Sequence, residues 1–147
     1  MYRHILYAVN TQEHSRSALQ KAYQLAQQNG ARLTLLHVVD FIPSDGADPM
    51  GASIPTTLPQ TLVAAEEQKL KEIIEASPPP EDIQLHTQVT LGSARHEIVT
   101  QAVERACDLI VIGHHKHRGL GHLLGHTDES VLHHTPCDVL AINLSDA

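Results

Sequence analysis

Short apolar runs rich in aliphatic residues alternate along this chain with stretches of helical periodicity. The first run, Ile5 to Val9, stops at Asn10, and apolar residues then recur at helical spacing until Asn29-Gly30. A second run, Arg32 to Val39, follows directly. Runs of this kind suit strands that are covered on both faces, and helix-length connections favour parallel pairing. The alternation therefore predicts an α/β domain with a mainly parallel sheet and helices on both faces.

The rest of the chain repeats this alternation after a long connection. The segment from Asp40 to Pro59 holds four prolines and two glycines, which predicts a connection without regular structure. The length of 147 residues fits one domain, residues 1–147. The elements predicted beyond the connection are a helix over Leu62–Ile74, an edge strand over Ile83–Val89, a helix over Ile98–Val103, a central strand over Leu109–Ile112, a short helix over Thr127–His134 and a fifth strand over Val139–Ile142.

Charge and composition argue against several classes of partner. The formal net charge is −7, and no block of Lys and Arg is longer than two residues, so the chain repels nucleic acids and anionic lipid surfaces. Its apolar runs are far too short to span a bilayer, so we expect a cytoplasmic protein without membrane contact. Cys107 and Cys137 match no CxxC spacing and are expected to be reduced thiols.

Five pieces of the sequence occur in the same order in a known family. They are the opening strand His4–Asn10, the second-strand piece Leu35–Val38, Gly92 followed by Ile98, the strand and turn Cys107–His115, and the closing strand Pro136–Leu140. No single piece is diagnostic, but five pieces in order over essentially the whole chain are specific. In these pieces the sequence resembles the universal stress protein family.

The resemblance implies a doubly wound five-stranded parallel sheet in the order 3-2-1-4-5. It also implies a homodimer through the fifth strand, over Val139–Asn143, whose edge would otherwise stay unpaired. In such sheets ligands bind where the strand order reverses, between the carboxyl ends of strands one and four. Asn10 and Gly113 follow these two ends, so the segment from Gly113 to Thr127 is the expected functional region. The implied function is a regulatory or protective module in the stress response.

One subgroup of the family binds ATP through an Asp after the first strand and a G-x-x-G-x9-G-[ST] loop after the fourth. Glycines in such a loop let backbone N–H groups approach phosphates, and a helix N-terminus offers unpaired donors. Gly113 matches the first glycine and Gly125 the third, although the interval between them is one residue short. Lys116 replaces the second glycine and Asn10 replaces the Asp. The resemblance therefore implies a degenerate nucleotide-binding loop.

The end of the loop also departs from the ATP-binding pattern. His126 stands where a hydroxyl residue is expected, although Thr127 follows it. For ATP or another adenine nucleotide, adenine is expected near Val9 and Val38 and the phosphates near the loop. The alternative is a nucleotide-free interaction module, in which Lys116 and its neighbours plug the cleft. The candidate nucleotide-binding residues are Ala8, Val9, Asn10, Val38, Ile112, Gly113, Lys116, Gly125, His126 and Thr127.

Histidines are concentrated near the same loop. Seven of the twelve fall between Gly113 and His134, and imidazole is a common ligand for zinc, copper and nickel, so metal binding is a further alternative. No H-E-x-x-H pattern or paired cysteine completes a defined site, so we expect a polar surface loop and assign no metal ligand. His37, inside the second strand, is expected to be a half-buried sheet residue.

Ser93, His96 and Glu97 are the nearest approach to a catalytic constellation in the sequence. They lie close together on one helix, which does not give a nucleophile, a base and an orienting acid the required geometry. We expect Ser93 to be a helix N-cap and Glu97 to lie near the positive end of that helix. The sequence thus predicts a protein that acts by binding and not as an enzyme.

Overall fold

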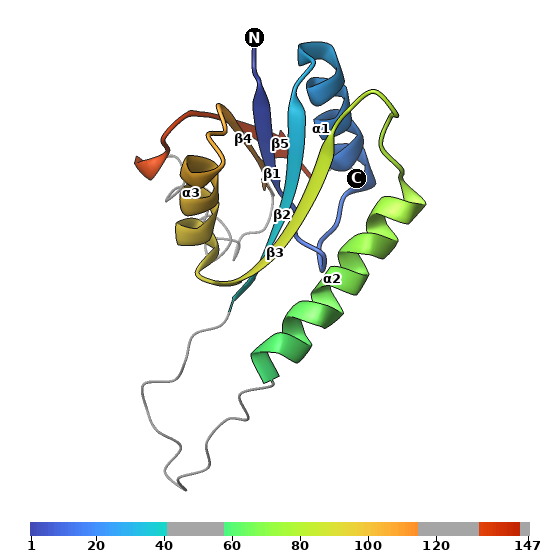
Figure 1. The fold of residues 1–147 in the computed structure, drawn as a ribbon, viewed down its shortest axis with the longest axis vertical. Coiled ribbons are helices and arrows are strands. Elements are labelled where there is room, and N and C mark those ends of the chain that lie inside the picture. Colours follow the sequence, from blue (N-terminus) through green and yellow to red (C-terminus); the bar gives the residue numbers. More distant parts are fainter. Residues whose placement is uncertain (41–57, 115–132, 145–147) are drawn as a thin grey trace, which may run out of the picture.

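The computed structural model describes residues 1–40, 58–114 and 133–144, which form a five-stranded sheet flanked by helices (Figure 1). All paired strands are parallel, and their order is β3-β2-β1-β4-β5. This confirms the doubly wound α/β fold expected from the sequence. The elements are β1 (His4–Ala8), α1 (Arg16–Asn29), β2 (Arg32–Asp40), α2 (Leu58–Ala76), β3 (Leu85–Gly92), α3 (Ala94–Glu104), β4 (Leu109–His114) and β5 (Asp138–Asn143).

The sheet separates two helical layers, with α1 and α2 on one face and α3 on the other (Figure 1). Alternate residues of β1 point to opposite faces, as the two-residue period of a strand requires. Ile5 packs in a cluster with Leu19 of α1 and Leu70 of α2. Leu6 packs in a second cluster with Ile98 of α3. Both faces of the inner strands are therefore covered, which explains their continuous apolar runs.

The first helix begins and ends where its sequence indicates. The Oγ of Ser15 accepts a hydrogen bond from the backbone N–H of Ala18 at 3.2 Å and caps the helix. Gly30 follows the last turn with a φ of 61°, a left-handed conformation that only glycine adopts without strain. The buried side of α1 carries small alanines that bring the helix close to the sheet: Ala18, Ala22 and Ala26.

Two predicted boundaries and one predicted position are wrong. β1, not β4, is the central strand, because a β-branched run reports burial on both faces and not rank in the sheet. α2 begins at Leu58, inside the connection predicted to lack regular structure, since the proline that follows is tolerated in the first turn of a helix. β3 extends to Gly92 because it pairs with β2 as far as Asp40.

Other expectations fall on parts of the chain that are only partly described. The middle of the long connection, residues 41–57, and most of the short helix predicted over Thr127–His134 lie outside the described residues. Ser93 occupies the N-cap position of α3, although its side chain makes no capping hydrogen bond, and Glu97 lies in the first turn of that helix.

Asp108 joins the starts of β1 and β4. Its carboxylate accepts hydrogen bonds from the backbone N–H groups of Arg3 at 2.9 Å and His4 at 3.1 Å. Burial opposes ionisation of this carboxyl, but the backbone donors of His4 and Arg3 outweigh it, so the pKa of Asp108 lies below its usual value. An ionised Asp108 therefore holds the amino-terminal edge of the two strands together.

His4 is a buried polar residue at the same edge, with a relative exposure of 6%. Its Nδ1 lies 3.0 Å from the carbonyl oxygen of Arg105, which can only accept, so Nδ1 carries the hydrogen. Its Nε2 lies 2.7 Å from the hydroxyl of Thr34, which can donate to it. Burial lowers the pKa of His4, so the ring is neutral and both of its nitrogens are satisfied.

Candidate functional site

The strand order reverses between β1 and β4. β2 and β3 lie on one side of β1, and β4 and β5 lie on the other. Ala8 and Ile112 are the Cα partners nearest to the carboxyl ends of the two strands. Val9 continues the line of β1, because its N–H donates to the carbonyl of Leu36 at 2.8 Å. The switch point at which ligands of doubly wound folds bind thus begins after Val9 and Ile112.

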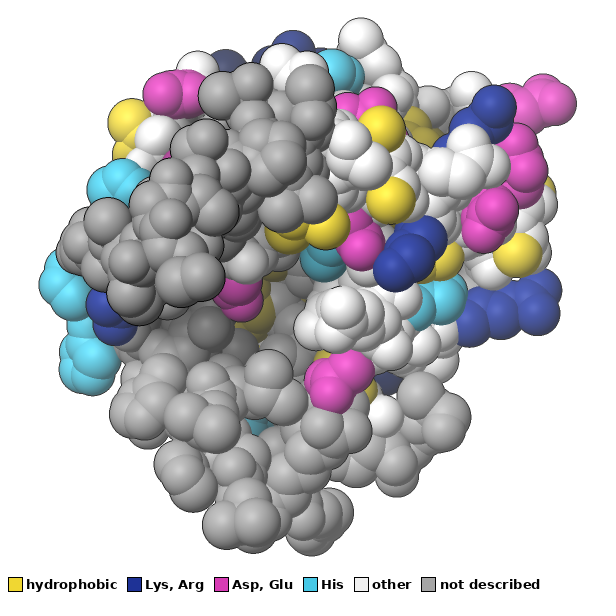
Figure 2. Space-filling model, turned by 90° about the horizontal axis from the view of Figure 1, so that it is seen from below, with side chains coloured by type: hydrophobic (Ala, Val, Ile, Leu, Met, Phe, Trp, Pro, Cys, Tyr) yellow, Lys and Arg dark blue, Asp and Glu magenta, His cyan; other side chains and the backbone are white. Residues whose placement is uncertain are grey.

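Figure 2 views the molecule from below Figure 1, onto the carboxyl ends of the strands. Among the described residues of the face, Lys and Arg side chains are interspersed with Asp and Glu and do not gather into one basic patch. The described surface is therefore unlike the continuous basic surface that binds a nucleic-acid backbone.

The predicted apolar contacts divide between the two faces of the sheet. Ile112 is buried in the cluster on the α3 side, and Ala8 and Val38 are partly buried against that cluster. Val9 is buried in the cluster on the α1 side. The structure therefore brings Ala8, Val38 and Ile112 together, and it places Val9 behind them.

Asn10 is exposed at the end of β1. Its side-chain oxygen accepts a hydrogen bond from the backbone N–H of Gln12 at 2.9 Å, the turn that Asn and Asp commonly form with the residue two positions on. Because the oxygen holds the turn, the side-chain amide is the group that remains to donate to a ligand. Asn10 is thus a polar group whose side chain is held by a turn at the end of β1.

Gly113 ends the buried part of β4 and is packed by the chain itself. A Cβ built on Gly113 would lie 2.5 Å from Cδ1 of Leu144, and the backbone N–H of Leu144 donates to the carbonyl of His114 at 2.8 Å. This close approach accounts for a glycine at position 113 without any ligand. The other predicted loop residues lie outside the described part of the chain: Lys116, Gly125, His126 and Thr127.

Three polar side chains form a cluster that sequence reasoning did not assemble, here named the His37 cluster: His37, Thr11 and Glu66. The Nε2 of His37 lies 3.2 Å from Oε2 of Glu66 and 3.3 Å from Oγ1 of Thr11. Its Nδ1 lies 3.0 Å from the carbonyl oxygen of Val9. The Thr11 hydroxyl donates to the same Glu66 carboxylate. His37 is 7% exposed, so it is buried where a half-buried core or sheet histidine was expected.

Glu66 is held as a carboxylate by its surroundings. The hydrogen bond from Thr11 lowers its pKa most, and Lys69 and His37 lower it further against the cost of burial. The Nζ of Lys69 lies 3.1 Å from Oε1 of Glu66. The two carboxylate oxygens therefore have separate partners, one on α2 and one in the His37 cluster.

A part of this cluster was visible in the sequence. A histidine inside an apolar strand needs hydrogen-bond partners when it is buried, so His37 itself signalled a polar contact. The partners carried no such signal, because Thr11 and Glu66 are 55 positions apart and Glu66 is one of several glutamates on its helix.

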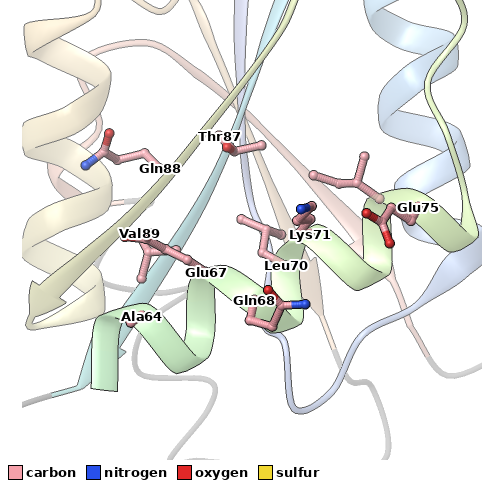
Figure 3. Close-up of a pocket in the computed structure, with 10 residues that line it drawn as sticks. Ala64, Glu67, Gln68, Leu70, Lys71, Glu75, Thr87, Gln88 and Val89 are labelled. Atoms are coloured by element: carbon pink, nitrogen blue, oxygen red, sulfur yellow. The ribbon is translucent and has the colours of Figure 1, made fainter. Parts of the chain in front are cut away.

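A groove of about 680 Å³ lies between α2 and the edge strand β3, away from the switch point (Figure 3). Leu70 and Val89 lie at its base, and charged side chains such as Glu67, Lys71 and Glu75 line it from α2. None of the candidate nucleotide-binding residues that were predicted from the sequence lines this groove. Its mixed lining and its position on the sheet edge separate it from the candidate site.

Within residues 1–40, 58–114 and 133–144, no group of three or more His, Cys, Asp or Glu side chains is placed to hold a metal ion. Most of the histidine-rich segment lies outside this part of the chain. None of the described helices combines the length and the apolar character that crossing a membrane requires.

Both cysteines are free thiols. Burial raises the pKa of Cys107 to about 11 and also raises the pKa of Cys137. Since the thiolate is the reactive form, neither thiol is activated as a nucleophile at neutral pH.

Comparison with known sequences gives a consistent result. Residues 1–143 match the sequence profile described as the Universal stress protein family. The chain is 33% identical over 141 residues to Universal stress protein A homolog 1 of Coxiella burnetii, and the match covers 96% of each chain.

Solved structures share the fold. The universal stress protein UspA from Lactobacillus plantarum matches with a TM-score of 0.62 and 27% identity, over 96% of this chain and 97% of that chain. A universal stress protein in complex with cAMP matches with a TM-score of 0.64 and 20% identity, over 96% of both chains.

Proposed function

Because this chain belongs to the universal stress protein family, we propose that it is a homodimeric regulatory module in the stress response that acts by binding and not by turnover. The observation that carries the proposal is the arrangement at the switch point. Exposed Asn10 follows the end of β1, where partly buried Ala8 and Val38 pack against buried Ile112 and form an apolar wall. An apolar wall with one fixed polar group suits a small planar ligand. The proposal keeps the cytoplasmic location that the sequence predicts.

We infer that the ligand is an adenine nucleotide. Adenine would lie against Ala8 and Val38, with the amide of Asn10 donating to a ring nitrogen or a ribose oxygen. The phosphates would lie toward Gly113 and the following loop, where Lys116 supplies a cation in place of the second glycine. The family relative in complex with cAMP supports this ligand class.

A second candidate function is a nucleotide-free interaction module. The contact between Gly113 and Leu144 favours it, because that contact explains the first glycine of the motif by packing alone. In this case Lys116 and His126 would fill the cleft, and the protein would act through its surface.

Dimerisation is proposed through the outer edge of β5, over Val139–Asn143. Leu140 on this strand is 39% exposed, and no described strand pairs with the outer edge. An exposed edge strand with an apolar side chain is a favourable surface for pairing with a second copy.

The test is calorimetric titration of the metal-stripped protein with Mg-ATP and, separately, with cAMP. Saturable heat that is lost in Asn10→Ala and Gly125→Val supports the nucleotide site. Gln12→Ala is the matched control, because it keeps the backbone N–H that Asn10 binds. Asn10→Asp also keeps the turn and restores the residue of the ATP-binding subgroup, so it is expected to bind Mg-ATP at least as well. Heat of dilution alone up to millimolar nucleotide would reject this ligand class and leave the interaction module.

A further inference from the structure

The neighbours of His37 determine where its ring needs hydrogens. The Val9 carbonyl, 3.0 Å from Nδ1, can only accept, so Nδ1 must carry a hydrogen. On the other side, Nε2 faces the ionised Glu66 carboxylate at 3.2 Å and the Thr11 oxygen at 3.3 Å. Thr11 gives its one hydroxyl hydrogen to Glu66, so it presents a lone pair to His37. All three of these neighbours, from the described residues, are acceptors, and their arrangement is fully satisfied only when both ring nitrogens carry hydrogen.

Loss of one proton cannot be absorbed without breaking this arrangement. The Val9 carbonyl keeps the hydrogen on Nδ1, so Nε2 would become a lone pair directed at two oxygen atoms. The Thr11 hydroxyl can donate to Nε2 or to Glu66, but not to both. One partly buried acceptor would then be left without a donor, which is an unfavourable state.

Within the described part of the chain, Glu66 is the charged group that contacts His37. From α2, Glu66 faces His37, and Lys69 binds the far oxygen of that carboxylate. β1 contributes the Val9 carbonyl, and the Cα partner of His37 on β3 is the apolar Val89. α1 turns apolar residues and the hydroxyl-bearing Tyr23 to this face, and the Tyr23 hydroxyl donates to the carbonyl of Ser77.

The His37 cluster contacts the chain on both sides of Asn10, at Val9 and at Thr11. Val9, before it, is bonded to Nδ1, and Thr11, after it, is bonded to Glu66 and faces Nε2. Asn10 itself is exposed, and its side chain is held by the turn to Gln12. The protonation of a buried ring on β2 is thus connected by direct contacts to the polar group of the candidate ligand site.

We propose that His37 and Glu66 are positioning residues that hold the segment Val9–Thr11 in its ligand-binding conformation while His37 is protonated, so that binding at the switch point weakens as His37 loses its proton. The dependence of binding on pH rests on the proposed function, whereas the movement of the segment with His37 does not.

The first experiment needs no nucleotide. Two-dimensional NMR would follow the ring protons of His37 and the backbone amides of Asn10, Thr11 and Gln12 from pH 5.5 to 8.5. We expect the amides to shift with the same midpoint as the ring of His37. In Glu66→Gln this shared midpoint should be lost, and in Glu67→Gln, an exposed matched control on the same helix, it should remain. Amides that ignore the titration of His37 overturn the proposal, whatever the protein binds.

The second experiment is calorimetry with Mg-ATP at pH 6 and pH 8. ATP itself titrates in this range, so the affinity of wild type is compared with that of His37→Gln at each pH. The glutamine keeps a side-chain N–H donor but does not titrate, and the ratio of the two affinities removes the contribution of ATP. We expect this ratio to fall by about tenfold between the two pH values, the size of one charge-assisted hydrogen bond. A constant ratio overturns the control of binding by His37. Absence of heat in every variant rejects the nucleotide as a ligand. The NMR titration then decides by itself whether the segment Val9–Thr11 is coupled to His37.

Discussion

Leu144 packs over the backbone of Gly113 so closely that a Cβ on Gly113 would lie 2.5 Å from Cδ1 of Leu144. The contact joins the residue after β5 to the end of β4, beside the switch point. It gives a glycine of the nucleotide motif a structural role that can be measured separately from ligand binding.

Gly113→Ala is therefore expected to lower the free energy of unfolding by about 1 kcal/mol, because the new methyl group overpacks the contact with Leu144. In a Leu144→Ala background the same substitution should become stabilising by about 0.5 kcal/mol, since alanine restricts the unfolded chain. Urea unfolding of the two single variants and the double variant measures the coupling. The same cost in both backgrounds would show that Leu144 is not the reason for the glycine.

Asp108→Asn should destabilise the protein by about 1 kcal/mol at pH 7, because an amide offers fewer acceptors to the N–H groups of Arg3 and His4. The pKa of Asp108 is lower in the folded state, so its contribution is present above the unfolded value near 3.9 and disappears as the pH falls through the folded value. Unfolding measured from pH 7 to pH 3 should show the difference between wild type and variant vanish at the acid end. Asp82→Asn, which alters an exposed carboxylate bonded to Gln27, is the control.

His4 also makes the free energy of unfolding depend on pH, but the cause is burial of the ring and not hydrogen bonds to a charged group. Burial lowers its pKa, so the unfolded chain takes up a proton first, and stability falls as the pH drops below the unfolded value near 6.5. The loss should level off below the folded pKa. His4→Gln is expected to flatten the slope of unfolding free energy between pH 7 and pH 5, and the exposed His86→Gln is expected to leave it unchanged. Equal slopes in wild type and His4→Gln would refute this assignment.

Leu140→Asp should convert the proposed dimer to monomers, because the charge would be buried at the β5 edge without a partner. Sedimentation equilibrium over a range of concentrations measures the change. Val103→Asp on α3 is the matched control, since Val103 is 59% exposed and lies on a different surface. A dimer that survives Leu140→Asp but dissociates in Val103→Asp would move the interface to α3.

The fold was predictable because its signals are local and repeated. Ser15 and Asn29-Gly30 mark the ends of α1, and the runs of β1, β2 and β4 are too apolar for anything but strands covered on both faces. The sheet order was predicted from the family resemblance. The apolar runs alone suggested that the β-branched β4 is central, which is wrong because β1 is central.

The site was only partly predictable because its parts are distant in sequence. Asn10 and Gly113 could be assigned to the candidate site because each follows a short apolar run, and the topology brings the ends of the two runs together. The contact of Thr11 with Glu66 depends on how α2 is seated against the sheet, which no periodicity reports. The reason for glycine at position 113 likewise lies in a residue beyond β5.

The two core clusters lie on opposite faces of one sheet and share no buried side chain. Substitutions on the α3 side and on the α1 side are therefore expected to add, because neither repacks the other. Substitutions in the layer beneath α3, where Ala8, Val38 and Ile112 lie, would therefore alter the proposed ligand site without repacking the other layer. The apolar cluster beneath α1 and α2 would stay packed through such changes, so the domain would keep the stability that this cluster provides.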